Sequence, residues 1–379
     1  MKNKRTISFT KSLGQFAKLV VVFLVVLSTG TIMASDSHTE KDEPFNAGDM
    51  IIHHISDAHS IHIGNLSIPL PVILFTEKGL DVFSSSNFGH EPHTVPYTSP
   101  KTGLTYVNVH EHIYYGDATG AVQTEMVLNE KTSLEEMHKL GPMDFSITKS
   151  VFGMFLIIFI MILVFRTVAK GYKKREGAAP KGIQNLFEPL IIFIRDEVAI
   201  PSLGKKKADL YLPFLLTVFF FIWMCNMLGL IPFLGGFNIT GTMSVTLVLA
   251  GIVFLITTFS GNKYYWGHIL WPPGVPLPIK LILVPIEFAS IFIKPAVLMV
   301  RLTANITAGH IIILAFVSLV ILFGEQGAAV GAGFGVGVGA VIFMVFMFFI
   351  ELLVAFLQAY VFTLLAALYF GDATQEAHH

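Results

Sequence analysis

The sequence predicts an α-helical polytopic membrane protein with about five membrane helices and a small, mostly β domain outside the membrane. Hydrophobic residues make up 53 % of the 379 residues, and charged residues make up only 13 %. After residue 146, apolar runs recur that reach the roughly 20 residues needed to cross a bilayer as a helix. The last two runs are separated by a glycine-rich segment and predict a long antiparallel hairpin at the end of the chain.

Residues 1–34 have the pattern of a secretory signal peptide. Basic residues precede the apolar run LVVVFLVVLSTGTIMA, and small residues surround Ala34 and Ser35. This arrangement favours cleavage near Ser35, and an uncleaved anchor helix is the alternative. Either interpretation exports the residues that follow, so we expect residues 35–145 to lie in the periplasm.

The exported residues 35–145 predict a β domain without a metal site. The runs IHIGNLSIPLPVILF and LTYVNVHEHIYYG resemble strands bounded by Gly, Pro and Asn. Imidazole is a frequent ligand of zinc and copper, but the spacing of the histidines matches no ligand set. The single cysteine, Cys225, lies far from them. The histidines concerned are His53, His54, His59, His62, His110 and His112.

The charge of the loops predicts the orientation of the membrane domain. Apolar runs at 147–168, 209–231 and 239–260 precede the hairpin. The loop between the first two is basic and therefore belongs in the cytoplasm. Its basic residues are Arg166, Lys170, Lys173, Lys174, Arg175, Lys181, Lys205, Lys206 and Lys207.

This orientation gives five spans with the C-terminus inside. The membrane domain covers residues 146–371, and residues 372–379 form a short cytoplasmic tail. The apolar stretch 184–200 carries four charged residues and predicts an amphipathic helix at the cytoplasmic interface. No basic cluster interleaved with aromatic residues suggests a nucleic-acid partner.

A row of polar side chains follows the first helix of the hairpin, residues 281–323. Glu287, Lys294 and Arg301 are spaced by sevens, and each step drifts by only about 20° around a helix. Asn305 lies one turn beyond Arg301. An arginine at bilayer depth costs about 2.5–3.5 kcal/mol on insertion scales, so such a residue is expected to be functional.

The second helix of the hairpin, residues 338–370, carries Glu351 and Gln358, again seven apart. In an antiparallel hairpin that turns near residue 330, Arg301 is level with Gln358. His310 is then level with Glu351. Because nine residues turn about 900°, we expect His310 to point away from the face of Arg301.

Three stretches resemble subunit a of the F-type ATP synthase: KPAVLMVRLTANITAGH, ELLVAFLQAYVFTLL and NMLGLIPF, which begins at Asn226. The resemblance covers about residues 145–370 and leaves out the first 140. It implies a steeply tilted hairpin facing a rotor ring of c subunits. The residues that match the family pattern are Asn226, Arg301, Asn305, His310, Glu351 and Gln358.

The resemblance implies a stator subunit with two offset proton half-channels, in a bacterial inner membrane. Protons would reach the rotor past Glu351, His310, Asn226 and Gln358 and leave past Glu287 and Ser290, with Arg301 between the two paths. No stretch matches a phosphate-binding loop, so we expect no nucleotide chemistry and no cofactor in this chain. Further expected partners are the peripheral stalk subunit b, membrane lipid and the remainder of the synthase.

Two other functions fit a polytopic chain with an exported domain. A secondary transporter with a charged midplane site would show internal repeats with paired broken helices, and the early and late spans share no similarity. A purely structural anchor for the exported domain would leave the intramembrane arginine unexplained.

Overall fold

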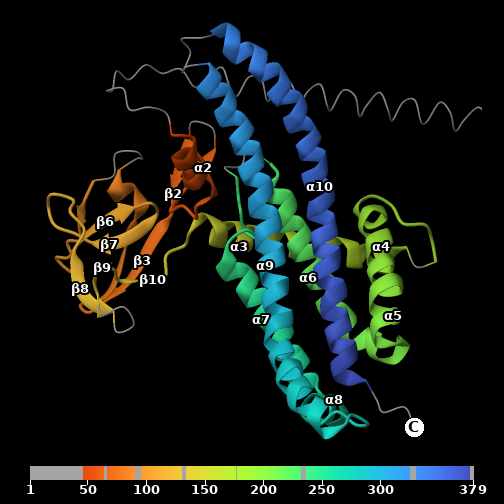
Figure 1. Cartoon of the computed structure of the whole chain (residues 1–379). Helices are drawn as coiled ribbons and strands as arrows, with labels where there is room; N and C mark the ends of the chain where they lie inside the picture. The colour runs from red at the N-terminus through yellow and green to blue at the C-terminus, as the bar shows by residue number, and fades with distance from the viewer. Residues whose placement is uncertain are drawn as a thin grey trace, which may run out of the picture. The chain divides into compact units, whose positions relative to one another are not determined.

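The computed structural model of the chain is shown in Figure 1. It describes residues 46–63, 66–89, 95–129, 134–175, 177–231, 236–324 and 330–375. All of these belong to one compact unit, Asn46–His379. The predicted signal segment 1–34 lies outside the described residues.

The described residues before the membrane helices form a small, mostly β domain, as predicted. It begins with helix α2 (Ala47–Ile55), which is capped by the side chain of Asn46 accepting from the backbone N–H of Gly48. The strands form antiparallel sheets in the orders β1-β2, β10-β3-β4, β5-β6-β7 and β8-β9. Their bounds are β1 Ser60–Ile63, β2 Leu66–Pro69, β3 Pro71–Thr76, β4 Gly79–Ser84, β5 Tyr97–Thr98, β6 Thr105–Val109, β7 His112–Tyr115, β8 Thr124–Asn129, β9 Leu134–Lys139 and β10 Met143–Asp144.

The two strand-like runs of the sequence coincide with β1 to β3 and with β6 and β7. Alternate side chains of these strands point into a common core, because successive residues of a strand face opposite sides. The buried core residues are Val72, Leu74, Phe88, Tyr106 and Ile113.

A buried histidine ties three segments of this domain together. His59 is only 4 % exposed, and its Nδ1 lies 3.3 Å from Oε2 of Glu111. Its Nε2 lies 3.3 Å from Oδ2 of Asp144. Burial alone would lower the pKa of His59, but hydrogen bonds and charge from Asp144 and Glu111 raise it to about 9. The imidazolium therefore bridges two carboxylates from distant parts of the sequence.

Neighbouring residues join the domain to the first membrane helix, α3 (Lys149–Lys174). The backbone N–H of Lys149 donates to the carbonyl of Ala58 at 2.8 Å. The N–H of Ser150 donates to Oδ1 of Asp57, also at 2.8 Å. These bonds satisfy two of the free N–H groups at the start of the helix.

Among the residues that the structure describes, five helices are long and apolar enough to cross a membrane, in agreement with the predicted spans. The membrane part also contains shorter helices, among them the π-helical turn η2. The bounds are α3 Lys149–Lys174, α4 Ile183–Phe193, η2 Ile194–Ala199, α5 Ile200–Leu203, α6 Lys205–Gly229, α7 Met243–Ser260, α8 Lys263–Leu270, α9 Leu277–Phe323 and α10 Val330–Thr374.

Helix α9 is continuous through Pro285 and Pro295. Its 47 residues extend about 70 Å, which is more than twice the roughly 30 Å of a bilayer core. A helix of this length fits the membrane only if it is strongly inclined. Helix α10 extends to Thr374, three residues beyond the expected end of the membrane domain.

Hydrogen bonds show which helix ends lie together. At one end, Nζ of Lys207 donates to the carbonyl of Thr374, and the N–H of Asn262 donates to the carbonyl of Ala373 at 3.0 Å. At the other end, Oγ of Ser150 lies 3.0 Å from Oγ1 of Thr242. The start of α6 and the ends of α7 and α10 therefore meet at one end.

The stretch predicted as an amphipathic interfacial helix is α4, the π-helical turn η2 and α5. One side of this segment packs into the main apolar cluster of the membrane domain through Phe187, Ile194 and Val198. The opposite side carries the exposed ion pair between Arg195 and Asp196. The amphipathic pattern thus reflects packing against the helix bundle.

We expect the β domain to lose stability at alkaline pH. The folded-state pKa of His59, about 9, lies above its ordinary value of 6.5. The stabilisation is therefore complete below pH 6.5 and is lost as the pH rises through 9, by about 3 kcal/mol in total. Hydrogen exchange of residues 60–115, corrected for the intrinsic rate, should show protection falling between pH 7 and pH 10.

The variant His59→Gln should remove this alkaline step, whereas His112→Gln should keep it, because His112 is exposed. An unchanged pH profile in His59→Gln would show that another group causes the loss.

Candidate functional site

The hairpin is antiparallel, and its two helices lie side by side (Figure 1). Near the turn, Gly324 and Gly333 are in backbone contact. Further along, the rings of Phe316 and Phe343 are 4.3 Å apart. The pairing continues to the far end, where Lys294 lies beside Asp372.

Arg301 projects from the bundle. Leu298 and Leu302, on the other side of the helix, are buried in the main apolar cluster. Arg301 itself is exposed, as are the small residues Ala304 and Ala308 beside it. Within the described part of the chain, no carboxylate lies within ion-pair distance of Arg301. The guanidinium group is thus available to a carboxyl group from outside.

Asn305 and Gln358 form a direct link between the two helices. Nδ2 of Asn305 donates to Oε1 of Gln358 at 2.9 Å. The sequence predicted that Gln358 would be level with Arg301, and the structure pairs it with the residue one turn further. Gln358 is buried, and its amide is held at Asn305, one helical turn along α9 from Arg301.

Glu351 lies against the backbone of α9. It is 8 % exposed, and its Oε1 fills the space where a Cβ at position 309 would stand, so a larger residue there would force the carboxylate to move. Its Oε2 has no hydrogen-bond partner among the described residues. An unsatisfied buried carboxyl oxygen is costly in a static apolar core and marks a place where a water molecule or a proton binds.

His310 follows Gly309 in sequence and faces another helix. Its Nε2 lies 3.5 Å from the position of a Cβ on Gly229 of α6. The same glycine approaches the carbonyl oxygen of Phe237. His310 thus points away from the face of Arg301, as expected, and its ring occupies space that a side chain at position 229 would need.

Both polar atoms of the Asn226 side chain bond to protein groups. Its Nδ2 donates to the carbonyl of Ala355 at 3.1 Å, and its Oδ1 accepts from Thr240 at 2.5 Å. The residue was predicted to line a half-channel, and the structure shows a bond that fixes α6 to α10. It lies one turn before Gly229, so it supports the wall next to His310.

A second polar cluster lies at the other end of the hairpin. Nζ of Lys294 is 3.8 Å from Oδ2 of Asp372 and 5.4 Å from the ring centroid of Tyr369. Burial and the charges of Asp372 and Glu287 raise the pKa of Tyr265, which places both carboxylates near this tyrosine. Ser290 is turned to its own helix and donates to the carbonyl of Glu287.

A small cavity of about 20 Å³ lies in this second cluster, next to Lys294, Asp372 and Tyr265. Thr258 also lines it, and its Oγ1 is buried without a partner among the described residues. A space of this size with polar walls suits a single water molecule.

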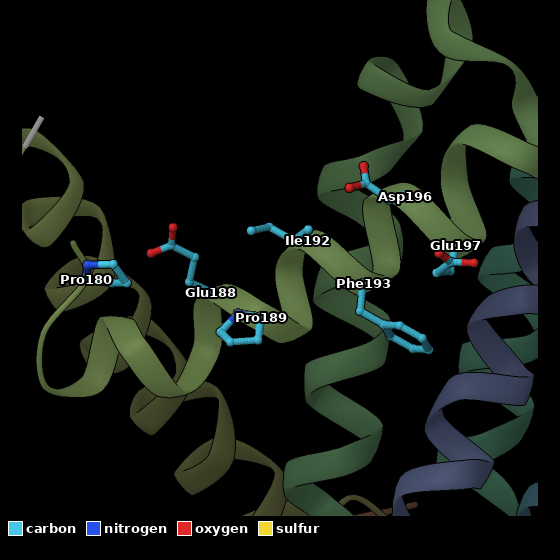
Figure 2. A pocket seen from close by; sticks show the side chains of 7 residues that line it. All are labelled: Pro180, Glu188, Pro189, Ile192, Phe193, Asp196 and Glu197. Atoms are coloured by element: carbon cyan, nitrogen blue, oxygen red, sulfur yellow. The ribbon is translucent and has the colours of Figure 1, made fainter. Parts of the chain in front are cut away.

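A larger recess of about 480 Å³ lies elsewhere, over α4 and the π-helical turn (Figure 2). None of the predicted ion-path residues lines it. Its lining residues are Pro180, Glu188, Pro189, Ile192, Phe193, Asp196 and Glu197. Despite its size, the recess is separate from the polar row of the hairpin.

The sequence did not reveal several of these groups. Asp372 lies fourteen residues after Gln358, which is twice the spacing between Glu351 and Gln358. The helical periodicity could therefore have indicated this residue. Gly309 was visible only as the residue before His310, and no pattern pointed to Thr240 or Thr258. Their roles depend on contacts between helices that are distant in sequence.

Both parts of the chain match known family models. Residues 151–371 match the family model described as ATP synthase A chain. Residues 50–144 match a family described only as a domain of unknown function.

Curated relatives match over most of the chain. ATP synthase subunit a 2 of Chlorobaculum tepidum is 38 % identical over 334 residues, which are 82 % of this chain and 91 % of the relative. ATP synthase subunit a of Pelodictyon phaeoclathratiforme is 37 % identical, over 76 % of this chain and 85 % of that protein. The match to these proteins and to the family model shows that the chain belongs to the ATP synthase A chain family.

Proposed function

We propose that this chain is the stator subunit of the membrane sector of ATP synthase and forms two offset proton half-channels against a rotor ring of c subunits. The observation that carries the proposal is the position of Arg301, which projects from the bundle between two polar clusters. A fixed positive charge favours the ionised form of a carboxyl group that comes within about 4–6 Å. Since guanidinium stays protonated, the same residue blocks a proton from crossing directly.

The access path on the periplasmic side would use the polar cluster nearer the hairpin turn, which contains His310 and Glu351. Glu351 supplies an unsatisfied carboxyl oxygen, and His310 supplies an imidazole beside Gly229. Gln358 and Asn305 lead from this cluster towards Arg301. Asn226 would border this path, where its hydrogen bond to the carbonyl of Ala355 joins α6 to α10.

The exit path on the cytoplasmic side would use the second cluster. Glu287, Lys294 and Asp372 lie near the helix ends that meet the basic loop. Tyr265 and the small cavity beside it add polar groups to this path. The orientation follows from the basic loop after α3, which stays in the cytoplasm.

Apolar packing favours a route around the outside of α9. Between the two clusters, the inner face of this helix is occupied by Leu298 and Leu302, which are buried with Phe362. A proton would therefore transfer to a rotor carboxyl group and travel with the ring. Each proton that crosses 100 mV releases about 2.3 kcal/mol, which rotation would carry to the remainder of the synthase.

The same proposal places the chain in the bacterial inner membrane, with the β domain in the periplasm and the C-terminus in the cytoplasm. Further partners would be membrane lipid and the peripheral stalk subunit b. A secondary transporter is not favoured, since the family match covers the whole hairpin.

The variant Arg301→Ala should abolish both ATP-driven proton pumping and proton-driven ATP synthesis, because no other cation faces the rotor at this depth. Inverted membrane vesicles with normal levels of the variant provide the measurement. Lys280→Ala is the control, since Lys280 lies over the ring of Trp271, outside both polar clusters of the hairpin, and it should keep at least about half of the activity. Normal pumping in Arg301→Ala would refute the role assigned to this residue.

The variant Gly309→Ala should slow ATP synthesis by about tenfold or more, because the new methyl group displaces the carboxylate of Glu351. Gly339→Ala, in the same hairpin, should have little effect, since no atom lies within 4 Å of a Cβ there. Equal activity of the two variants would show that the position of Glu351 is unimportant.

His310 and Glu351 should behave as one unit. Each single change to Ala should slow synthesis, and the double change should cost much less than the sum, because both residues serve one path. The exchange of His310→Glu with Glu351→His should retain more activity than either half alone. Additive losses without rescue by the exchange would separate the two residues.

A further inference from the structure

The sheet β10-β3-β4 of the exported domain has an apolar outer face. Its members are Phe75, Leu80, Val82, Met143 and Phe145, which are between 48 and 66 % exposed. We call these five residues the outer sheet face. On the inner side of the same strands, Val72, Leu74 and Asp81 are buried.

The strand register gathers these side chains into one patch. Phe75 stands between its partners Leu80 on β4 and Met143 on β10. Val82 pairs with Ile73, and the N–H of Phe145 donates to the carbonyl of Ile73 at 2.9 Å. Contiguous exposed apolar patches mark sites of interaction with a partner or a membrane.

The chain leads from this patch directly into the membrane. After β10, the N–H of Ile147 still bonds the carbonyl of Pro71, so the strand stays extended up to the N-cap of α3, Thr148. Phe145 and the exposed Phe152 of α3 are separated by seven residues. Three extended residues and one helical turn connect these two residues, so their Cα atoms lie at most about 16 Å apart.

A second contact holds the domain against the membrane helices. Ile61 and Leu70 of the β domain share one apolar cluster with Ile157 of α3 and Leu228 of α6. The outer sheet face therefore belongs to a domain that is fixed beside the bilayer.

We propose that the outer sheet face lies in the lipid headgroup and acyl boundary of the leaflet at which α3 begins. The outward positions of β3 and β10 carry no charged group, and aromatic side chains favour the membrane interface. The proposal rests on α3 crossing the membrane and is independent of the ion path.

Spin labels on the full chain in lipid vesicles test this contact. Single cysteines are introduced as Val82→Cys, Leu80→Cys or Phe145→Cys in a Cys225→Ala background. Ala121→Cys is the matched control, because Ala121 is exposed in the same domain and lies outside the patch. The measurement compares collisions of each nitroxide with oxygen, which dissolves in lipid, and with a water-soluble nickel complex.

Labels on the outer sheet face should have an oxygen-to-nickel collision ratio several-fold higher than the label at Ala121. Equal ratios at all positions would place the patch in water and overturn the proposal. Protection of the patch labels from both reagents would show that protein covers it, either a second copy or another segment, and would also overturn it. Two labelled positions that agree exclude an effect of one misfolded variant.

Discussion

The arrangement of the membrane domain depends on holding one guanidinium group at bilayer depth. Such a group costs about 2.5–3.5 kcal/mol to insert and cannot lose its proton to reduce that cost. Leu298 and Leu302 offset it, since their burial against α6 and α10 fixes the rotation of α9. Arg301 is then committed to the outward face, where none of the described residues places a carboxylate within ion-pair distance of it.

Glycine allows the remaining polar groups to sit between closely packed helices. A Cβ at Gly309 would collide with the carboxylate of Glu351, and one at Gly229 would crowd His310 and the carbonyl of Phe237. At these positions the backbone itself forms the wall of the site. Glycine destabilises a helix interior by about 1 kcal/mol relative to alanine, so its presence at these two positions indicates that the close packing requires it.

The sequence was sufficient for the spans and for the order of polar residues along the hairpin. Both depend on helical periodicity, which is local. It did not show that Asn226 bonds Ala355, or that His59 lies between Glu111 and Asp144, because those contacts join residues 129, 52 and 85 positions apart. Strand runs were visible for the same local reason, while the pairing of strands and the buried imidazolium depend on tertiary structure.

The β domain and the polar cluster around His310 and Glu351 are connected through one set of apolar contacts. Ile61 and Leu70 pack in the same cluster as Leu228 and Phe237. Leu228 adjoins Gly229, and the carbonyl of Phe237 closes the space behind that glycine, next to His310. A displacement of the domain would therefore move the wall against which His310 rests. The domain is thus better regarded as part of the support of the site than as an independent attachment.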